Sequence, residues 1–266
     1  MNSLTVWWDG AADGALNMGA DECLAREAES RGGLLVRCYG WSATTVSLGA
    51  FQKIDEARRG ISEIQGLQLV RRPSGGGAIV HGSDMTYAAA VPKSHPWGAT
   101  PQILYEALHG AMAGALAGHG IVARQSEGGA SSAQPETAGR DEEESFFCFD
   151  RRAAGDLVID RLEEPRGVKI MGSAQRRLAG VVLQHGSLLL RHNATVAGRA
   201  RHPAAADLVG GAMPDHETLA REWVRRIADR LGARLDEEPK SFLVGRDADI
   251  AKLSQRFREE WWTARR

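Results

Sequence analysis

Apolar residues recur along this chain with two spacings, one typical of strands and one typical of helices. Leu34, Val36 and Cys38 alternate along one face of a short segment, as in a half-buried strand. Between residues 101 and 119 the apolar positions repeat every three or four residues and predict a helix with a broad buried face. The same spacings predict strands at 4–8, 41–48, 66–72, 78–81, 85–91, 155–160 and 167–172, and helices at 17–30, capped by Asn17, and at 215–231 and 246–264.

The pattern changes around residues 165–190, where polar and charged side chains interrupt the apolar runs. Residues 181–183 and 188–190 have β character and flank Gln184 and His185, while Lys169 stands alone among apolar neighbours. Burying an ammonium costs several kcal/mol unless it is paired or has lost its proton. Lys169 is therefore either a surface residue whose head stays in water or a residue with a chemical role.

Residues 125–145 differ from the rest of the chain because they are polar, rich in Ser and Gly, and contain an Asp-Glu-Glu-Glu run. This composition predicts a flexible surface insertion without secondary structure. Charged, helical periodicity returns in a C-terminal region at about residues 215–266. We expect one domain over residues 1–266 that contains both the insertion and this helical region.

Composition and charge narrow the class of protein. Hydrophobic residues make up 43% of the chain and charged residues 25%, which is ordinary for a globular protein. The formal net charge of −1 gives no overall attraction to nucleic acid or to an acidic membrane, so neither is an expected partner. The first residues lack the basic and apolar regions of a signal peptide, and no apolar run is long enough to cross a bilayer. We therefore expect a soluble, cytoplasmic protein.

Three consecutive glycines at 75–77 follow two arginines and precede His81. Glycines permit positive φ angles and let a ligand approach bare amides, but a plain hairpin turn has the same composition. The segment matches neither the phosphate-binding loop nor the dinucleotide-binding glycine motif. Because successive strand residues point to opposite faces, we expect one of Arg71 and Arg72 to face a ligand and the other to face solvent or a carboxylate. His81, close to both features, is a candidate lining residue.

The cysteines at 23, 38 and 148 show neither metal-ligand spacing nor a disulfide framework, so we predict no metal site. Cys23 and Cys38 lie on the apolar faces of a predicted helix and strand and are assigned to the core. Cys148 lies among phenylalanines directly after the acidic segment. It is either a buried strand residue or a thiol at the mouth of a pocket. A thiolate beside acidic residues needs a nearby cation, for which Lys169 is the candidate.

Four motifs, taken together and in order, point to a known family. They are Asn17-Met18-Gly19-Ala20-Asp21-Glu22, Arg71-Arg72-Pro73-Ser74-Gly75-Gly76-Gly77-Ala78-Ile79-Val80-His81 with Thr86-Tyr87, Cys148-Phe149, and Lys169-Ile170-Met171-Gly172-Ser173-Ala174-Gln175-Arg176-Arg177 leading to His185-Gly186-Ser187. These motifs resemble those of the superfamily of lipoate-protein ligases, octanoyltransferases and biotin-protein ligases. Within it, the chain is most similar to the LipM-type octanoyltransferases, over roughly residues 4–190.

The resemblance implies an α+β fold with mixed, largely antiparallel sheets and packed helices, and no separate accessory domain. A long tunnel in this fold would hold an octanoyl-sized acyl chain, with Lys169 at the acyl carbonyl. The substrate-binding residues that the resemblance implies are Arg71, Arg72, Gly75, Gly76, Gly77, His81, Gly172, Ser173, Ala174 and His185.

The family has two chemistries, which differ in how the acyl group is activated. Transferases take octanoate from acyl carrier protein onto a cysteine and pass it to a lysine of a lipoyl domain. The match at Cys148 implies this route, with Cys148 as nucleophile and Lys169 as the group that favours the thiolate and carries protons. The donor would be octanoyl-acyl carrier protein and the acceptors lipoyl-domain proteins, such as glycine cleavage H protein or 2-oxoacid dehydrogenase subunits. This route requires no cofactor.

The alternative is an ATP-dependent lipoate-protein ligase, which forms an acyl-adenylate. The triple glycine is more similar to ligases than to the Gly-Gly-Arg of LipM-like proteins, and the 125–145 insertion departs from the family pattern. A ligase would require ATP and Mg, with Arg71 or Arg72 and the glycine turn holding the adenylate phosphate. A non-catalytic acyl-binding protein is a third hypothesis, which the joint presence of Cys148 and Lys169 disfavours.

Overall fold

The computed structural model describes residues 3–55, 61, 67–127 and 146–265. The predicted insertion at 125–145 therefore lies outside the described residues, except for residues 125–127. The strands are β1 Ser3–Ala12, β2 Leu34–Trp41, β3 Thr45–Leu48, β4 Gln68–Arg71, β5 Ile79–His81, β6 Met85–Pro92, β7 Arg124–Gln125, β8 Leu157–Arg161, β9 Glu164–Arg177, β10 Val181–Leu188 and β11 Arg234–Glu237. The helices are α1 Gly14–Arg31, α3 Pro96–Ala99, α4 Pro101–Gly118, α5 Ala205–Val209, α6 His216–Leu231, α7 Asp247–Arg258 and α8 Glu260–Thr263, with short 3-10 turns η1 Cys148–Asp150 and η2 Gly198–Ala200.

Two sheets form the framework. The larger has eight strands in the order β11-β1-β2-β6-β10-β9-β8-β7, and the smaller has three in the order β4-β3-β5. In the larger sheet β1 runs parallel to both β11 and β2, and every pairing from β2 to β7 is antiparallel. The predicted α+β fold with mixed, largely antiparallel sheets is confirmed.

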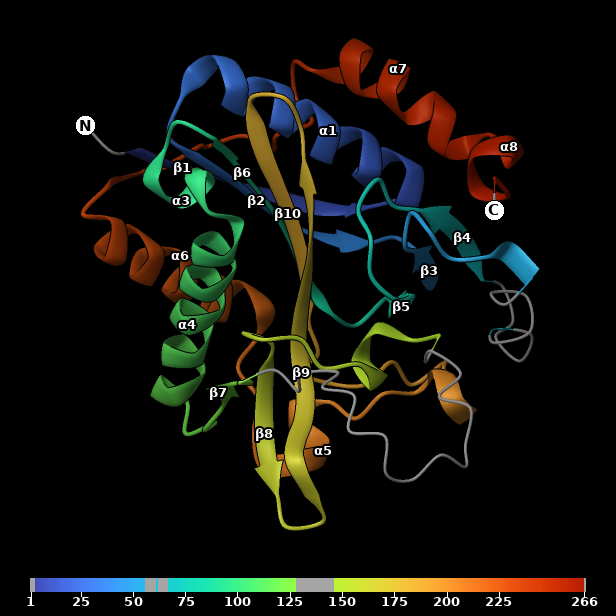
Figure 1. The fold of residues 1–266 in the computed structure, drawn as a ribbon, viewed down its shortest axis with the longest axis vertical. Coiled ribbons are helices and arrows are strands. Elements are labelled where there is room, and N and C mark those ends of the chain that lie inside the picture. The colour runs from blue at the N-terminus through green and yellow to red at the C-terminus, as the bar shows by residue number, and fades with distance from the viewer. Residues whose placement is uncertain (1–2, 56–60, 62–66, 128–145, 266) are drawn as a thin grey trace, which may run out of the picture.

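Helices cover both faces of the larger sheet. Helices α1 and α7 lie together along one side in Figure 1, and α4 and α6 lie on another. Because side chains alternate along a strand, neighbours such as Leu35 and Val36 enter different apolar clusters, one packed on α1 and α7 and the other on α4 and α6. Strands β6 and β10 are buried along their whole length, since they lie between these two layers.

Helix α1 begins earlier than the sequence predicted. Its cap is Asp13, whose carboxylate accepts the Leu16 amide at 2.9 Å, and not Asn17. Asn17 lies inside the helix, where its side-chain amide donates to the carbonyls of Ala12 and Gly40. Both residue types favour caps, so the sequence alone did not separate them.

The segment around Lys169 forms a long hairpin that reaches from the edge of the larger sheet to its centre. Strand β9 pairs with β8 along its first half and with β10 along its second half. The apolar run at 181–183, the polar residues after it and Leu188 form one continuous strand, β10, whereas residues 189 and 190 of the second apolar run lie beyond its end. This hairpin carries Lys169 towards the glycine turn that precedes β5.

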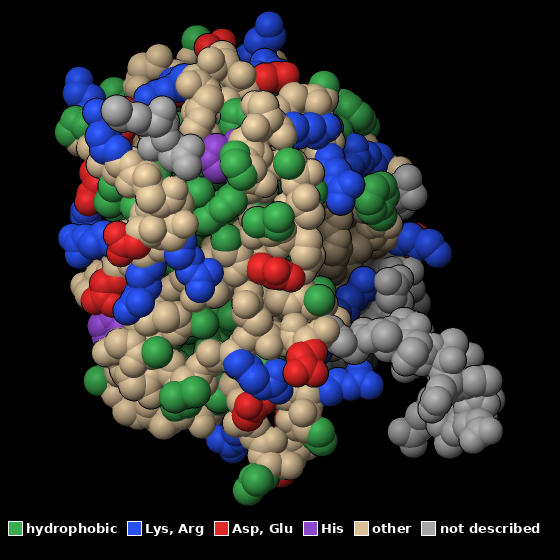
Figure 2. All heavy atoms as spheres, turned by 60° about the vertical axis from the view of Figure 1, so that its left-hand side comes forward, with side chains coloured by type: hydrophobic (Ala, Val, Ile, Leu, Met, Phe, Trp, Pro, Cys, Tyr) green, Lys and Arg blue, Asp and Glu red, His purple; other side chains and the backbone are tan. Residues whose placement is uncertain are grey.

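The surface mixes charges of both signs. On the face shown in Figure 2, Lys and Arg side chains are interspersed with Asp and Glu side chains. Among the residues that the structure describes, no helix has the length and hydropathy needed to cross a membrane.

Candidate active site

Cys148 and Lys169, which the sequence suggested as a reacting pair, lie side by side. The Lys169 Nζ atom is 3.5 Å from Cys148 Sγ and 3.2 Å from the Cys148 carbonyl oxygen. Lys169 projects from β9 and is buried, whereas Cys148 begins η1 and is partly exposed. An ammonium in this position stabilises a thiolate and donates to it. The geometry therefore suits a reactive thiol that a substrate can reach.

The other two cysteines belong to the core, as predicted. Burial raises the pKa of Cys38 to about 12 and also raises the pKa of Cys23. Each packs into one of the two apolar clusters of the larger sheet. Neither thiol is suited to nucleophilic chemistry near neutral pH.

The glycine turn holds the backbone of Cys148. The Cys148 amide donates to the Ala78 carbonyl at 2.8 Å, and the Ala78 amide donates to the Phe146 carbonyl at 2.9 Å. A Cβ atom on Gly77 would lie 2.7 Å from the Cys148 nitrogen, so no other residue fits there without movement. Gly76 has a φ of +89°, in the region that favours glycine. These two glycines let the turn lie directly against the segment that carries the thiol.

Asp156 lies beside Lys169 and was not among the site residues predicted from the sequence. Its carboxylate is fully buried, and Oδ2 lies 2.9 Å from Lys169 Nζ. A buried ammonium requires a partner, and residues 155–160 contain two aspartates, Asp156 and Asp160. Asp160 is exposed and pairs with Arg124, whereas Asp156 is buried against the lysine. Residue type alone does not distinguish the two aspartates.

Gly172 and Ser173 shape the other side of Lys169. A Cβ atom on Gly172 would overlap the Lys169 side chain, lying 2.6 Å from Nζ. The Ser173 hydroxyl is within 2.7 Å of both Tyr87 Oη and His109 Nε2, and its amide donates to Tyr105 Oη at 3.2 Å. The hydroxyl and the backbone amide of Ser173 thus both form hydrogen bonds inside the protein, whereas Gly172 provides space for the lysine.

His109 determines which atoms donate and which accept in the hydrogen bonds around Ser173. Its Nδ1 atom lies 2.7 Å from the Gly155 carbonyl oxygen, which only accepts, so Nδ1 carries the proton and Nε2 accepts from Ser173. Burial lowers the pKa of His109 to about 4, so the ring is neutral near pH 7. The network orders the Gly172–Ser173 segment without adding a charge to it.

Arg71 and Arg72 have different partners, as expected for successive strand residues, and both side chains are buried. Arg71 donates to the carbonyls of Gly49, Gln52 and Thr263. The bonds to Thr263 tie β4 to α8. Arg71 thus has structural partners in the loop after β3 and in α8.

Arg72 lies closer to the thiol. It donates to the carbonyls of Gly75 and Gly77, at 3.1 and 2.8 Å, and to the Ser47 hydroxyl at 2.7 Å. Its Nε atom is buried and has no hydrogen-bond partner among the described residues. Burial lowers the pKa of Arg72 to about 10, and a thiolate at Cys148 opposes this shift. Arg72 is therefore a second cation on the Cys148 side of the turn.

A cavity between β5, α1 and the centre of the larger sheet adjoins this turn. Its lining includes four predicted residues, Arg72, His81, Ala174 and His185, together with apolar side chains from Met18, Trp41 and Ile79. An apolar lining with a few polar groups is the usual character of a site for an acyl chain or similar ligand. The structure thus gathers residues from three of the four motifs around one space.

Each histidine in this lining is held between a serine and an aspartate. His81 lies 2.7 Å from both Ser47 Oγ and Asp84 Oδ2. His185 contacts the Ser74 hydroxyl through Nε2 and lies 3.3 Å from Asp21 Oδ2 through Nδ1. Burial lowers the pKa of His185. Both ring orientations are therefore fixed before any ligand binds.

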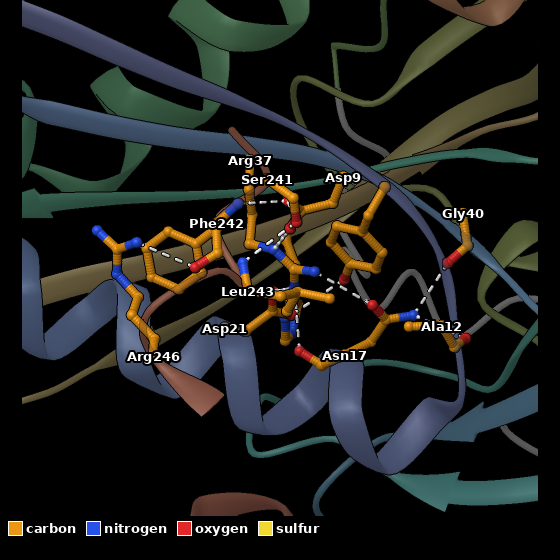
Figure 3. Close-up of polar contacts among 12 residues, drawn as sticks. Asp9, Ala12, Asn17, Asp21, Arg37, Gly40, Ser241, Phe242, Leu243 and Arg246 are labelled. Carbon is orange, nitrogen blue, oxygen red and sulfur yellow. Dashed lines mark hydrogen bonds and ion pairs between the residues drawn. The ribbon is translucent and has the colours of Figure 1, made fainter. Parts of the chain in front are cut away.

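The aspartate behind His185 belongs to a buried ionic network at the base of the cavity (Figure 3). Arg37 donates to Asp21 at 2.7 Å and to Asp9 at 2.8 Å, and all three side chains are fully buried. Burial alone would raise the pKa of Asp21, but the hydrogen bond from His185 and the charge of Arg37 outweigh it and lower the pKa. The network anchors α1 to β1 and β2 and keeps Asp21 ionised behind the histidine.

Among the residues that the structure describes, no three His, Cys, Asp or Glu side chains are grouped so as to hold a metal ion. The Lys169 ammonium is a cation in direct contact with the thiol.

Comparison with known proteins shows that the sequence of this chain is similar to one protein family. The model of the family described as the lipoyl protein ligase A/B catalytic domain matches residues 13–238. An octanoyltransferase LipM of Anoxybacillus flavithermus is 37% identical over 179 residues, which cover 66% of this chain and 61% of the relative. An octanoyltransferase LipM of Kyrpidia tusciae is 30% identical over 280 residues, with 97% of each chain covered. The match thus spans about three-fifths of the length of the first relative and nearly all of the second.

Solved structures share the fold at low sequence identity. A lipoate-protein ligase A bound with ATP has a TM-score of 0.68 at 17% identity, and covers 99% of each chain. A bipartite lipoate protein ligase from Thermoplasma acidophilum, determined in a study that includes its E2 lipoyl domain, has a TM-score of 0.66 at 17% identity, over 99% of this chain and 96% of that chain. At this identity the likeness establishes the fold alone.

Proposed function

Because the chain belongs to the family of the lipoyl protein ligase A/B catalytic domain, we propose that it is an octanoyltransferase of protein lipoylation that carries the acyl group on Cys148. The sequence likeness to octanoyltransferases named LipM supports this reaction over others of the family. The donor is octanoyl-acyl carrier protein and the acceptor is a lysine of a lipoyl domain.

The contact between Cys148 and Lys169 is the observation that carries this proposal. A thioester intermediate requires a thiolate and a group that manages protons, and Lys169 lies 3.5 Å from the sulfur. The partial exposure of Cys148 leaves the sulfur accessible to a carrier-bound thioester. A ligase has no use for such a nucleophile.

In the first half-reaction the Cys148 thiolate attacks the carbonyl carbon of the donor thioester. The new carbon–sulfur bond forms as the bond to the carrier thiol breaks, and the leaving thiolate takes a proton from the Lys169 ammonium. In the second half-reaction the neutral amine of the acceptor lysine attacks the Cys148 thioester. Lys169, now an amine, takes a proton from the acceptor nitrogen, and Cys148 leaves as a thiolate.

The energetics of this sequence require no cofactor. Exchange between two thioesters is close to thermoneutral, and amide formation from a thioester is downhill. Protons balance over the cycle, since the one that Lys169 gives to the carrier thiol is replaced by one from the acceptor amine. The cavity lined by Ile79, Ala174 and His185 is the proposed location of the octanoyl chain.

Mass spectrometry of the acylated protein tests this function. Incubation with octanoyl-acyl carrier protein should add one octanoyl group at Cys148, and a lipoyl domain should then remove it. The variant Cys148→Ala should form no adduct and should lose transfer activity by at least about 100-fold. Cys23→Ala, which changes a buried cysteine, is the matched control. Full activity of Cys148→Ala would exclude the thioester route.

ATP-dependent lipoate ligation is the second candidate function. The observation that favours it is Arg72, a buried guanidinium that has no carboxylate partner among the described residues and an Nε atom without a hydrogen bond. Such a group is suited to an anion, and a ligase reaction would supply one as the adenylate phosphate formed from ATP, for which Mg would also be required. Lipoate-dependent release of pyrophosphate from ATP would establish this function and displace the first.

A further inference from the structure

Asp156 lies against Lys169 in the same buried space as Cys148. Its Oδ2 atom is 2.9 Å from Lys169 Nζ, and the remaining close partners of that nitrogen are the Cys148 carbonyl oxygen at 3.2 Å and Cys148 Sγ at 3.5 Å. An ammonium has three hydrogens, and these three acceptors match them. The carboxylate and the ammonium are both buried, and each compensates the charge of the other.

Asp156 is itself held in place from two further directions. The Tyr105 hydroxyl donates to Oδ1 at 2.5 Å, and the Ala153 amide donates to Oδ2 at 2.7 Å. Burial and the neighbouring carboxylate raise the pKa of Tyr105 far above its usual value, so this hydroxyl keeps its proton. With both oxygens engaged, the carboxylate has a single orientation.

The absence of a side chain at Gly172 completes the arrangement. A Cβ atom there would lie 2.6 Å from Lys169 Nζ and 3.3 Å from Asp156 Oδ1. The Tyr105 hydroxyl that holds Asp156 also accepts the Ser173 amide, next along β9. The same atoms therefore fix the carboxylate, the lysine and the strand that carries it.

We propose that Asp156 is a positioning residue that keeps the Lys169 nitrogen charged and directed at the Cys148 sulfur. This inference rests on the proposed acyl transfer. When Lys169 gives its proton to the leaving carrier thiol, the carboxylate holds the resulting amine in place. When the acceptor nitrogen gives up a proton, the carboxylate stabilises the ammonium that forms again. Asp156 touches neither substrate in this scheme and acts through Lys169.

Other ionisable groups around the pair do not substitute for Asp156. His109 on α4 and His202 before α5 are both buried, and burial lowers the pKa of each. Arg72 carries positive charge on the Cys148 side. Asp156 is thus the carboxylate that contacts Lys169 among the described residues.

The variant Asp156→Asn tests the proposal with two readouts. Without the carboxylate, Lys169 loses the partner that favours its ammonium, so the alkaline limb of the transfer pH profile should move to lower pH. The rate of acyl transfer should fall by about 100-fold, with the KM for the donor changed by less than about threefold. Asp160→Asn, which removes an exposed aspartate of β8, the strand that directly follows Asp156, should match the wild type in both respects.

The second readout needs no acyl substrate. Alkylation of Cys148 by iodoacetamide at pH 7 should slow by about tenfold in Asp156→Asn, because the sulfur loses the ammonium fixed beside it. A wild-type protein that forms no octanoyl adduct would refute the proposed function, whereas alkylation would still decide the role of Asp156. A folded Asp156→Asn protein with unchanged alkylation and an unchanged alkaline limb would overturn the proposal.

If Asp156→Asn does not fold, Tyr105→Phe tests the same positioning role. This variant keeps the carboxylate but frees Oδ1, so acyl transfer should fall by about fivefold with the donor KM unchanged. A thermal melt within a few degrees of the wild type confirms folding. Wild-type transfer rates in a folded Tyr105→Phe protein would likewise count against a positioning role.

Discussion

Gly172 illustrates how a single residue sets the geometry of the site. It lies on β9 three residues after Lys169, and the lysine side chain folds back over it. The space that a Cβ atom would fill is occupied by the lysine side chain, which lies between Asp156 and the thiol. A glycine that the sequence analysis treated as a substrate-binding residue thus has a direct effect on the position of the lysine.

Gly172→Ala should therefore impair catalysis more than folding. The added methyl group displaces Lys169 Nζ from Cys148, and we expect transfer activity to fall by at least about 10-fold, with a loss of stability of about 1–3 kcal/mol. Steady-state rates and urea unfolding of the same preparation measure both effects. Gly10→Ala is the matched control, since a Cβ atom there meets nothing within 4 Å. Equal activities of the two variants would contradict this prediction.

Asp84 is the residue whose charge should dominate the response of this region to acid. It accepts hydrogen bonds from His81, Thr86 and Ser187, each at 2.7 Å. Burial alone would raise the pKa of Asp84, but the charge of His81 and these hydrogen bonds outweigh burial and hold the pKa well below its usual value. A depressed pKa means that the folded protein binds this proton more weakly than the unfolded chain does.

The stabilisation from Asp84 should therefore be complete above about pH 4, the ordinary range of an aspartate, and be lost as the pH falls further. Asp84→Asn should lower the free energy of unfolding at pH 7 by about 1.5–3 kcal/mol. The difference from the wild type should shrink in urea unfolding measured at pH 3. A constant difference between pH 7 and pH 3 would show that the charge of Asp84 does not contribute.

Residue chemistry determined what was predictable about the site. Cys148 and Lys169 stood out because a lone thiol beside an acidic run and a lone lysine among apolar residues both require an explanation. Asp156 did not stand out, since an aspartate next to a glycine at the start of a strand is ordinary. Arg71 and Arg72 look equivalent in sequence, but in the fold Arg71 donates to a carbonyl in α8 and Arg72 to a carbonyl of the glycine turn.

At the scale of elements, the contact between α1 and α7 determines how the C-terminal region closes the fold. Gly19 of α1 faces Ser254 and Ile250 of α7 at a distance that excludes a methyl group. Beyond α7, Trp262 donates to the Arg71 carbonyl and Arg71 donates to the Thr263 carbonyl. The last helices are thus tied to the strand that leads into the glycine turn.

Gly19→Ala should loosen this contact. A Cβ atom would lie 2.9 Å from the Ser254 amide nitrogen and 3.0 Å from the Ile250 carbonyl oxygen, so backbone must move. We expect a loss of about 1–3 kcal/mol in the free energy of unfolding and faster amide exchange in α7. Hydrogen exchange measured by mass spectrometry resolves the two helices. Unchanged protection of α7 would show that the helices accommodate the methyl group without separating.

Helices and strands could be predicted from the sequence more accurately than the way in which distant strands pair. The helices at 101–119 and 215–231 and the strand at 155–160 agree with α4, α6 and β8 within a few residues, whereas β9 extends beyond the expected 167–172 at both ends. Strand β11 was missed, because Arg234–Glu237 is charged and short and acquires its structure by pairing with β1. Local pattern cannot reveal a strand whose partner lies more than two hundred residues away.

At the scale of the whole molecule, positive and negative charges nearly cancel. The net charge is −1, and charges of both signs share the face shown in Figure 2. The proposed acceptor and donor proteins would therefore not be attracted from a distance by the net charge of the molecule. Any electrostatic guidance must come from lysines and arginines close to the site.

Acyl transfer to a folded lipoyl domain should therefore depend on salt over a short range. We expect the rate to fall as ionic strength rises from about 0.01 to 0.5 M, because the screening length shortens from about 30 Å to a few Å. Transfer to a short lysine peptide should change little over the same range. A rate with the protein acceptor that does not respond to salt would refute local charge recognition.

The parallel pairing of β1 with β11 has a consequence for biosynthesis. Residues 3–6 pair with residues 234–237, which lie more than two hundred residues further along the chain. Until residues 234–237 have been translated and have left the ribosome, the open side of β1 has no native neighbour and is available to chaperones or to other nascent chains. Completion of this side of the sheet must therefore await synthesis of the chain through residue 237.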